Sequence, residues 1–307
     1  MDLSNLFSRL IVLFIYIVVG FIAAKVKKIE SDTVKKVNTV LLYIGQPAMI
    51  ISSVLDTRLT MSIRDVGELF LLAVIMQLLL LLFAYIFIPV FVRKKADRGL
   101  FKFMAAFGNV GFMGFPIVSA LYGPDAVFLA AICIIPFFIS TYSIGIVMVK
   151  GGVNGEKLGW KFLLNPALIS TFAAVALFFL KLPLPTEVLE AASGLAGILI
   201  PLSMVCIGAN LGMNRLSELI ADWRMFALSF LKLILCPILI FVICRIFVSN
   251  EVYLGILVVS AAMPAAVLAS MFSTEYGADV NVASRGVFIT TLLSLVTIPA
   301  VLHILFG

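Results

Sequence analysis

The chain has 307 residues, of which 63% are hydrophobic and only 12% are charged, and its mean hydropathy is +1.21. Soluble domains are about half apolar and a quarter charged, so this composition excludes an ordinary soluble domain and indicates an all-α integral membrane protein. The net charge of +6 comes from lysines and arginines in short loops. Because no DNA- or RNA-binding motif lies beside them, we expect no nucleic-acid partner.

A membrane-spanning helix needs about 20 mostly apolar residues, and ten segments meet that requirement. They are 6–24, 36–54, 68–92, 101–122, 126–149, 163–180, 188–212, 225–248, 252–274 and 280–305. Only short polar loops remain between them, so no soluble domain is expected. The first segment lacks a small-residue cleavage site, which predicts an uncleaved signal anchor. Asn165 and Pro166 fit the cap and the first turn of the sixth segment.

The lysines and arginines predict how the chain crosses the membrane. Fifteen of the 22 lie in the odd-numbered loops and five on the opposite side. Cytoplasmic loops are enriched in Lys and Arg, so we expect a multi-pass protein of the cell membrane with both termini outside the cytoplasm. The other two, Lys232 and Arg285, fall inside predicted segments.

Residues that commonly hold metals or carry catalysis are sparse. The four cysteines form no CxxC pair, and His303 is the single histidine of the sequence. A disulfide framework, a metal site and a haem motif are therefore not expected. HExxH and GxSxG motifs are absent from the sequence, so we expect neither catalytic residues nor an enzyme.

The two halves of the chain resemble each other. YGPDAV at 122–127 corresponds to YGADVN at 276–281, an offset of 154 residues. This offset predicts two repeats of five segments, 1–153 and 154–307. Because five is odd, the second repeat enters the membrane from the opposite face, and such inverted repeats are typical of secondary transporters.

The stretch GNVGFMGFP at 108–116 places helix-weakening residues inside the fourth segment. Proline removes a helical hydrogen bond, and the backbone groups freed by a break must face protein or water rather than lipid. We therefore predict broken fourth and ninth segments that line a cavity and present helix N-termini to an anion. Close helix packing is the alternative role of the glycines. The residues expected at the two breaks are Gly108, Gly111, Gly114, Pro116, Met263 and Pro264.

Three polar side chains inside the predicted segments are candidates for substrate contact. The amide of Asn109 can donate to a carboxylate, although it can also bridge two helices. Lys232 can attract an anion or can extend to the near interface. Gln77 lies one residue from the repeat position of Lys232. No carboxylate lies at the centre of a predicted segment, so no buried proton-carrying acid is evident.

The motifs GNVGFMGFPIVSALYG, LLNPALIS and EYGADVNVAS, in this order, resemble the auxin efflux carrier family in its prokaryotic branch. The resemblance covers essentially all ten segments and implies a fold shared with bile acid/sodium symporters. Segments 1, 2, 6 and 7 would form a scaffold able to dimerise. Segments 3–5 and 8–10 would form a moving transport domain, with segments 4 and 9 broken and crossing. By this resemblance Asn109 matches the asparagine before the crossover, and Pro116 and Pro264 match the crossover prolines.

The same resemblance implies elevator-type transport of small organic anions such as auxins or dicarboxylates. The expected partners are that anion, membrane lipids and a second copy of the chain. No cofactor is expected, and sodium or proton coupling stays open. A sodium-coupled symporter is the alternative, and a channel is less favoured because paired broken helices are typical of alternating access. Only Gln77 stands in the third segment where the family's plant members carry an acid.

Overall fold

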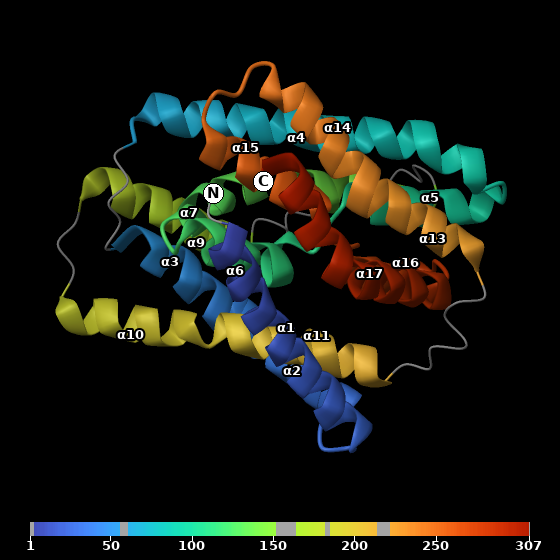
Figure 1. Ribbon diagram of the computed structural model, residues 1–307, viewed down its shortest axis with the longest axis horizontal. Coiled ribbons are helices and arrows are strands. Elements are labelled where there is room, and N and C mark those ends of the chain that lie inside the picture. Colours follow the sequence, from blue (N-terminus) through green and yellow to red (C-terminus); the bar gives the residue numbers. More distant parts are fainter. Residues whose placement is uncertain (1–2, 56–60, 152–163, 182–184, 214–221, 307) are drawn as a thin grey trace. The chain divides into compact units, whose positions relative to one another are not determined.

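The computed structural model describes residues 3–55, 61–151, 164–181, 185–213 and 222–306. The regular secondary structure of this part of the chain is helical, apart from one isolated antiparallel bridge (Figure 1). The α-helices are α1 (Leu3–Lys25), α2 (Ser31–Val40), α3 (Gln46–Leu55), α4 (Ile63–Phe91), α5 (Lys95–Ala106), α6 (Phe115–Tyr122), α7 (Ala126–Ser140), α8 (Ile146–Lys150), α9 (Pro166–Leu180), α10 (Thr186–Gly197), α11 (Leu199–Met213), α13 (Trp223–Phe230), α14 (Cys236–Arg245), α15 (Glu251–Ala262), α16 (Leu268–Tyr276) and α17 (Val280–Phe306).

In the described residues four π-helical turns continue these helices, and three of them precede a proline. They are η1 (Leu41–Gly45), η2 (Val110–Gly114), η3 (Thr141–Gly145) and η5 (Leu231–Leu235). Pro47, Pro116 and Pro237 each lie two residues after the end of such a turn. A proline has no N–H to donate, and its ring clashes with the carbonyl four residues earlier. The wider turn relieves both problems, so the helix passes through the proline without ending.

Six continuous helical runs in the described residues are long and apolar enough to cross a membrane. They are Ser31–Val54, Ile63–Phe91, Ala126–Lys150, Thr186–Met213, Trp223–Arg245 and Val280–Phe306. Four shorter apolar helices lie at Ile11–Lys25, Val110–Tyr122, Pro166–Leu180 and Glu251–Ala262. Helices of this length and composition are those of a multi-pass membrane protein.

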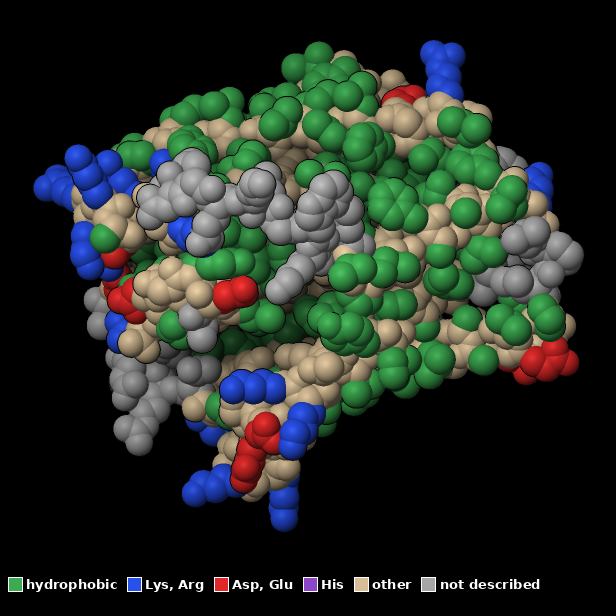
Figure 2. Space-filling view, turned by 180° about the vertical axis from the view of Figure 1, so that it is seen from behind, with side chains coloured by type: hydrophobic (Ala, Val, Ile, Leu, Met, Phe, Trp, Pro, Cys, Tyr) green, Lys and Arg blue, Asp and Glu red, His purple; other side chains and the backbone are tan. Residues whose placement is uncertain are grey.

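The outer surface of the helices is apolar, as a lipid environment requires. On α1 the side chains of Ile11, Ile15, Val18 and Ile22 recur at helical spacing, and each is more than half exposed. Figure 2 shows hydrophobic side chains over most of the visible surface, with few charged side chains among them. Such a face would be unfavourable in water but is suited to contact with acyl chains.

The chain divides into two compact units, each of which takes helices from both halves of the sequence. The first unit comprises Met1–Leu69, Gly111–Ile135 and Leu163–Arg215, and the second comprises Phe70–Val110, Pro136–Phe162 and Leu216–Gly307. Predicted segments 1, 2, 6 and 7 thus share one unit. Segments 4 and 5 were expected together with 3 and 8–10, but each is divided between the units. The repeat at 1–153 and 154–307 stays a prediction.

Packing within the first unit explains why parts of segments 4 and 5 belong to it. Helix α6 packs on α1. In α7 the ring of Phe128 lies 4.9 Å from the ring of Phe178 in α9, measured between centroids. These contacts join residues far apart in the sequence, so no local pattern predicts them.

Glycines allow α1 and α11 to pack with their backbones in contact. A Cβ on Gly20 would overlap the carbonyl oxygen of Val205, and a Cβ on Gly208 would overlap that of Ile17. Gly208 and Gly212 have the GxxxG spacing that brings membrane helices close together. Neither helix can therefore accept a side chain at these positions without moving apart.

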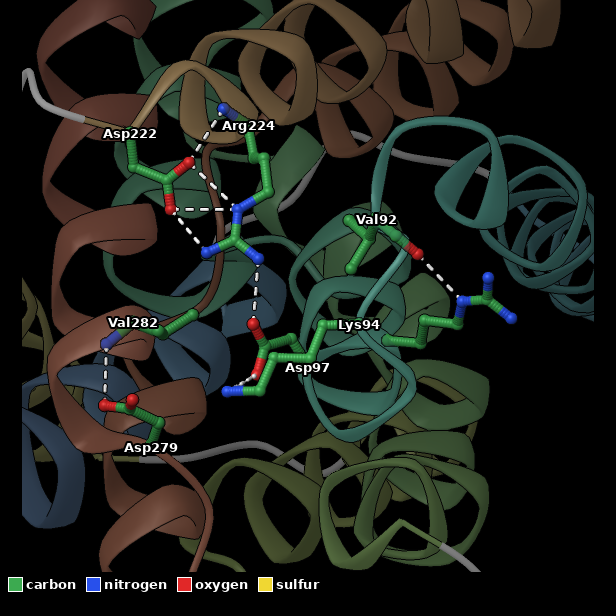
Figure 3. A network of polar contacts seen from close by, with 8 residues as sticks. Val92, Lys94, Asp97, Asp222, Arg224, Asp279 and Val282 are labelled. Carbon is green, nitrogen blue, oxygen red and sulfur yellow. Dashed lines mark hydrogen bonds and ion pairs between the residues drawn. The ribbon is translucent and has the colours of Figure 1, made fainter.

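An ion-pair network joins α5 to α13 in the second unit (Figure 3). The buried Asp97 carboxylate accepts a hydrogen bond from Arg224 Nη1 at 2.8 Å and lies 3.3 Å from Lys94 Nζ. Asp222 caps α13 and accepts further hydrogen bonds from Arg224. Those bonds, and then the positive charges of Arg224 and Arg285, lower the pKa of Asp222. The sequence indicated no role for Arg285. In the structure its positive charge lowers the pKa of Asp222.

We expect Gly208→Ala to lower the free energy of unfolding by about 1–3 kcal/mol, because the added methyl group overpacks a backbone contact. A Cβ on Gly194 in α10 would have no atom within 4 Å, so Gly194→Ala is the matched control and should be neutral or slightly stabilising. The measurement is the thermal unfolding midpoint of the purified protein in detergent. Equal midpoints for the two variants would contradict the close packing.

We expect Asp97→Asn to destabilise the protein by about 1–3 kcal/mol, since it removes the buried acceptor of a charge-assisted hydrogen bond. Asp32→Asn is the control, because Asp32 pairs with Lys36 at the surface, where both side chains are more than two-thirds exposed and such pairs contribute little. The free energy of unfolding measured by denaturation in detergent should be clearly lower for Asp97→Asn than for Asp32→Asn. A reversed ranking would show that the Asp97 network does not hold α5 to α13.

Candidate functional site

The helix in the fourth predicted segment is interrupted at Phe107–Asn109. Helix α5 ends at Ala106, and Phe107 has an extended backbone (φ −111°, ψ 115°). The helix resumes with η2 at Val110. The break therefore lies at the start of the GNVGFMGFP stretch rather than along it. Three residues expected at the break instead lie in the helix that follows it: Gly111 and Gly114 in η2 and Pro116 in the first turn of α6.

The ninth predicted segment is interrupted in the same way. Helix α15 ends at Ala262, Met263 is extended (φ −63°, ψ 140°), and α16 begins only at Leu268. Pro264 lies inside this gap, where its missing N–H removes no helical hydrogen bond. The Met263–Pro264 prediction thus coincides with the gap between α15 and α16.

The two interrupted segments pair with each other. Gly108 and Ala265 form an antiparallel bridge. Asn109 N donates to Pro264 O at 2.8 Å, and Ala266 N donates to Phe107 O at 3.0 Å. All of these residues belong to the second unit. The pairing satisfies backbone groups that the broken helices would otherwise leave unbonded in an apolar interior.

A threonine of α17 completes this arrangement. Thr290 Oγ1 accepts a hydrogen bond from Ala265 N at 3.1 Å and donates to the carbonyl of Gly286 one turn earlier in its own helix. The hydroxyl is fully buried, so both of its partners are protein groups. Thr290 was not predicted as a site residue, although a Thr-Thr pair in an apolar segment is a visible signal.

Gly108 provides space at the crossing, the place where Phe107–Asn109 pairs with Met263–Ala266. A Cβ at this position would lie 3.0 Å from Met263 Cβ, 3.2 Å from Met263 O and 3.4 Å from Lys232 Nζ. A side chain at this position would require Met263 to move by a few tenths of an ångström, so glycine suits this close approach. The same distances show that the Lys232 ammonium lies beside the crossing.

Lys232 is a buried lysine of the second unit. It lies in η5, and its relative exposure is 0%. In the described part of the chain its Nζ has no hydrogen-bond partner. The side chain does not extend to a surface, which was the alternative left open by the sequence. A buried cation without a partner is costly, and intramembrane cases are functional candidates.

Asn109 places an amide next to the same crossing. Its backbone N–H is used in the pairing with Pro264, and the residue is buried at 6% exposure. Among the described residues its side chain makes no hydrogen bond that would fix it to another helix. The second unit therefore brings together Gly108, Asn109, Met263, Pro264 and Lys232.

The remaining candidates are distributed elsewhere. Gln77 is buried in the middle of α4, and its amide nitrogen lacks a hydrogen-bond partner within the described ranges. Gly111, Gly114 and Pro116 belong to the first unit. There the Gln46 amide nitrogen lies 2.6 Å from where a Cβ of Gly111 would be, and it too lacks a described partner. Gln46 was not predicted as a site residue, although a glutamine in an apolar segment is a visible signal.

The site offers groups that suit an anion and few that suit a metal. The Lys232 Nζ lies 3.4 Å from where a Cβ of Gly108 would stand, and the next residue, Asn109, carries a side-chain amide. Ammonium groups and amides both favour negative charge. In the described part of the chain the four cysteines are free and buried, and no three metal-ligating side chains gather.

Comparison with known proteins gives the same class of protein. The chain is 23% identical over 294 residues to an uncharacterized transporter of Methanocaldococcus jannaschii, with 94% of this chain and 95% of the relative covered. It is 25% identical to an uncharacterized transporter of Methanothermobacter thermautotrophicus, with 93% of each covered. It is 24% identical to a Rhizobium meliloti protein named "Putative malonate transporter", with 94% of this chain and 92% of that protein covered.

A family described as "Membrane transport protein" matches the chain twice, over residues 6–157 and 153–302. Together the two matches cover nearly the whole sequence. The chain therefore belongs to this membrane transport family, the auxin efflux carrier-like family that its motifs resemble.

Proposed function

We propose that the protein is a secondary transporter of small organic anions, specifically carboxylates of the auxin or dicarboxylate kind. The observation that carries this proposal is the buried Lys232 Nζ beside the crossing at Gly108, for which the described residues offer no hydrogen-bond partner. A carboxylate bound there would supply the missing negative charge and could accept from the Asn109 amide. The name of the Rhizobium meliloti relative makes malonate the first dicarboxylate to test.

The broken segments suit a transporter because they allow polar backbone to occur at membrane depth without contacting lipid. We propose elevator-type alternating access, in which segments 3–5 and 8–10 move against a scaffold of segments 1, 2, 6 and 7. The scaffold would also form a homodimer. The two inverted repeats, the location in the cell membrane and the placement of both termini outside the cytoplasm are part of the same proposal, supported by the charge distribution.

We expect Asn109→Ala to reduce malonate counterflow by about tenfold or more, because a hydrogen bond to a charged group contributes about 1.5–3 kcal/mol. The measurement is uptake of labelled malonate into proteoliposomes preloaded with malonate, with malate and indole-3-acetate as further substrates. Asn281→Ala is the control, since Asn281 is exposed in the first turn of α17. Both variants should unfold at the wild-type temperature.

Several outcomes would contradict the proposal. Unchanged flux in Asn109→Ala would remove this amide from the site. Flux that is linear in substrate concentration, without counterflow, would favour a channel over a carrier. Loss of uptake when potassium replaces sodium outside the liposomes would favour the sodium-coupled alternative. No uptake of any carboxylate by the wild-type protein would exclude the proposed substrate class.

A further inference from the structure

Lys232 presents a charge problem that the binding of an anion would solve. Its Nζ is buried within the second unit, and the described residues offer it no hydrogen bond. A charged ammonium in such surroundings loses its hydration and receives no opposite charge in return. Burial therefore disfavours the charged form of this side chain, relative to its form in water, while the site is empty.

The helices around Lys232 do not supply the missing charge. Its turn η5 packs on α5, α13, α14, α15 and α17. Asp97 and Arg224 bind each other, as do Arg245 and Glu251. The other titratable side chains on or flanking these elements are Lys94, Lys95, Arg98, Lys102, Asp222, Cys236, Cys244, Tyr253, Asp279, Arg285 and His303. Within the described part of the chain, no ion pair joins any of them to Lys232.

A carboxylate would change this balance when it binds beside Gly108. Opposite charges a few ångströms apart in a medium of low dielectric constant attract strongly. The approaching carboxylate therefore favours the ammonium over the amine, and the side chain takes a proton from water. The crossing is suited to this exchange because Gly108 has no side chain between its backbone and Lys232. The Lys232 Nζ lies 3.4 Å from where a Cβ of Gly108 would stand.

We propose that Lys232 binds one proton with each carboxylate, so that anion and proton cross the membrane together. The inference rests on the proposed function, whose substrate supplies the counter-charge. The amine accepts a proton from the side on which the carboxylate enters, and the ammonium returns it to water when the carboxylate leaves on the other side. No other bond forms or breaks. The empty carrier then returns without an unpaired charge, which would be costly inside a membrane.

Binding and protonation are linked, which fixes the sign of the pH dependence. Above the pH at which the empty site loses its proton, the malonate complex holds one proton more than the free protein. Raising the pH must therefore weaken malonate binding, by up to about tenfold per pH unit. Below that pH the amine is already protonated, and the affinity becomes independent of pH.

The test measures proton uptake when malonate binds to the purified full-length protein in weakly buffered detergent solution, with a pH-indicator dye, from pH 6.5 to 9.5. The wild type should take up about one proton per bound malonate at the alkaline end. Lys232→Arg keeps a cation that cannot be deprotonated, so it should bind malonate with no proton uptake and no pH dependence. Lys36→Arg is the matched control, because the side chain of Lys36 is 77% exposed, and should behave as the wild type.

Each outcome decides the inference. Malonate binding by the wild type without proton uptake, or proton uptake by Lys232→Arg equal to that of the wild type, would overturn proton coupling and leave the proposed function intact. Malonate uptake into proteoliposomes that follows a sodium gradient and ignores a pH gradient would overturn it as well. No binding of malonate, malate or indole-3-acetate by the wild type would overturn the proposed function itself, and this inference with it.

Discussion

The pairing of two extended segments, Phe107–Asn109 and Met263–Ala266, is the interaction on which the candidate site depends. A helix that stops inside an apolar interior leaves backbone donors and acceptors without partners, and each is costly in the absence of water. The antiparallel bridge between Gly108 and Ala265, with Thr290 as a further partner, provides these bonds from protein alone. The site can therefore present an irregular backbone, and the Lys232 ammonium beside it, without contact with lipid.

Small residues and prolines shape the helices within each of the two units. The π-helical turns before Pro47, Pro116 and Pro237 let long helices continue through residues that would otherwise end them. Gly208 and Gly20 bring α11 and α1 into backbone contact in the first unit. In the second unit, Asp97 and Arg224 fasten the end of α5 to α13, and α13 continues through η5, which carries Lys232. The Asp97–Arg224 pair and the buried Lys232 therefore belong to one continuous helical run, α13 and η5.

Much of this architecture could be predicted from local sequence. Hydropathy indicated ten apolar segments and a membrane protein, and each segment contains an apolar helix in the described residues. The Asn165-Pro166 pair predicted a helix start, and Asn165 does accept a hydrogen bond from Ala167 N. The glycine-rich stretch indicated a broken fourth segment but not the exact residues, because Gly111 and Gly114 are equally compatible with a helical turn. Contacts between distant residues, such as Asp97–Arg224 and Ala265–Thr290, leave no periodic signal, and the division of segments 4 and 5 between two units depends on such contacts.

The contact between a carboxylate and the Lys232 ammonium can be measured directly. Malonate labelled with ¹³C at its carboxyl groups, bound to ¹⁵N-lysine protein in liposomes, allows dipolar dephasing between carboxyl carbon and lysine nitrogen to be recorded by solid-state NMR. Dephasing that indicates an ion-pair distance of about 4 Å or less in the wild type, and its loss in Lys232→Arg, is the expected result. Saturating malonate without dephasing in the wild type, or dephasing that persists in Lys232→Arg, would show that the anion binds elsewhere.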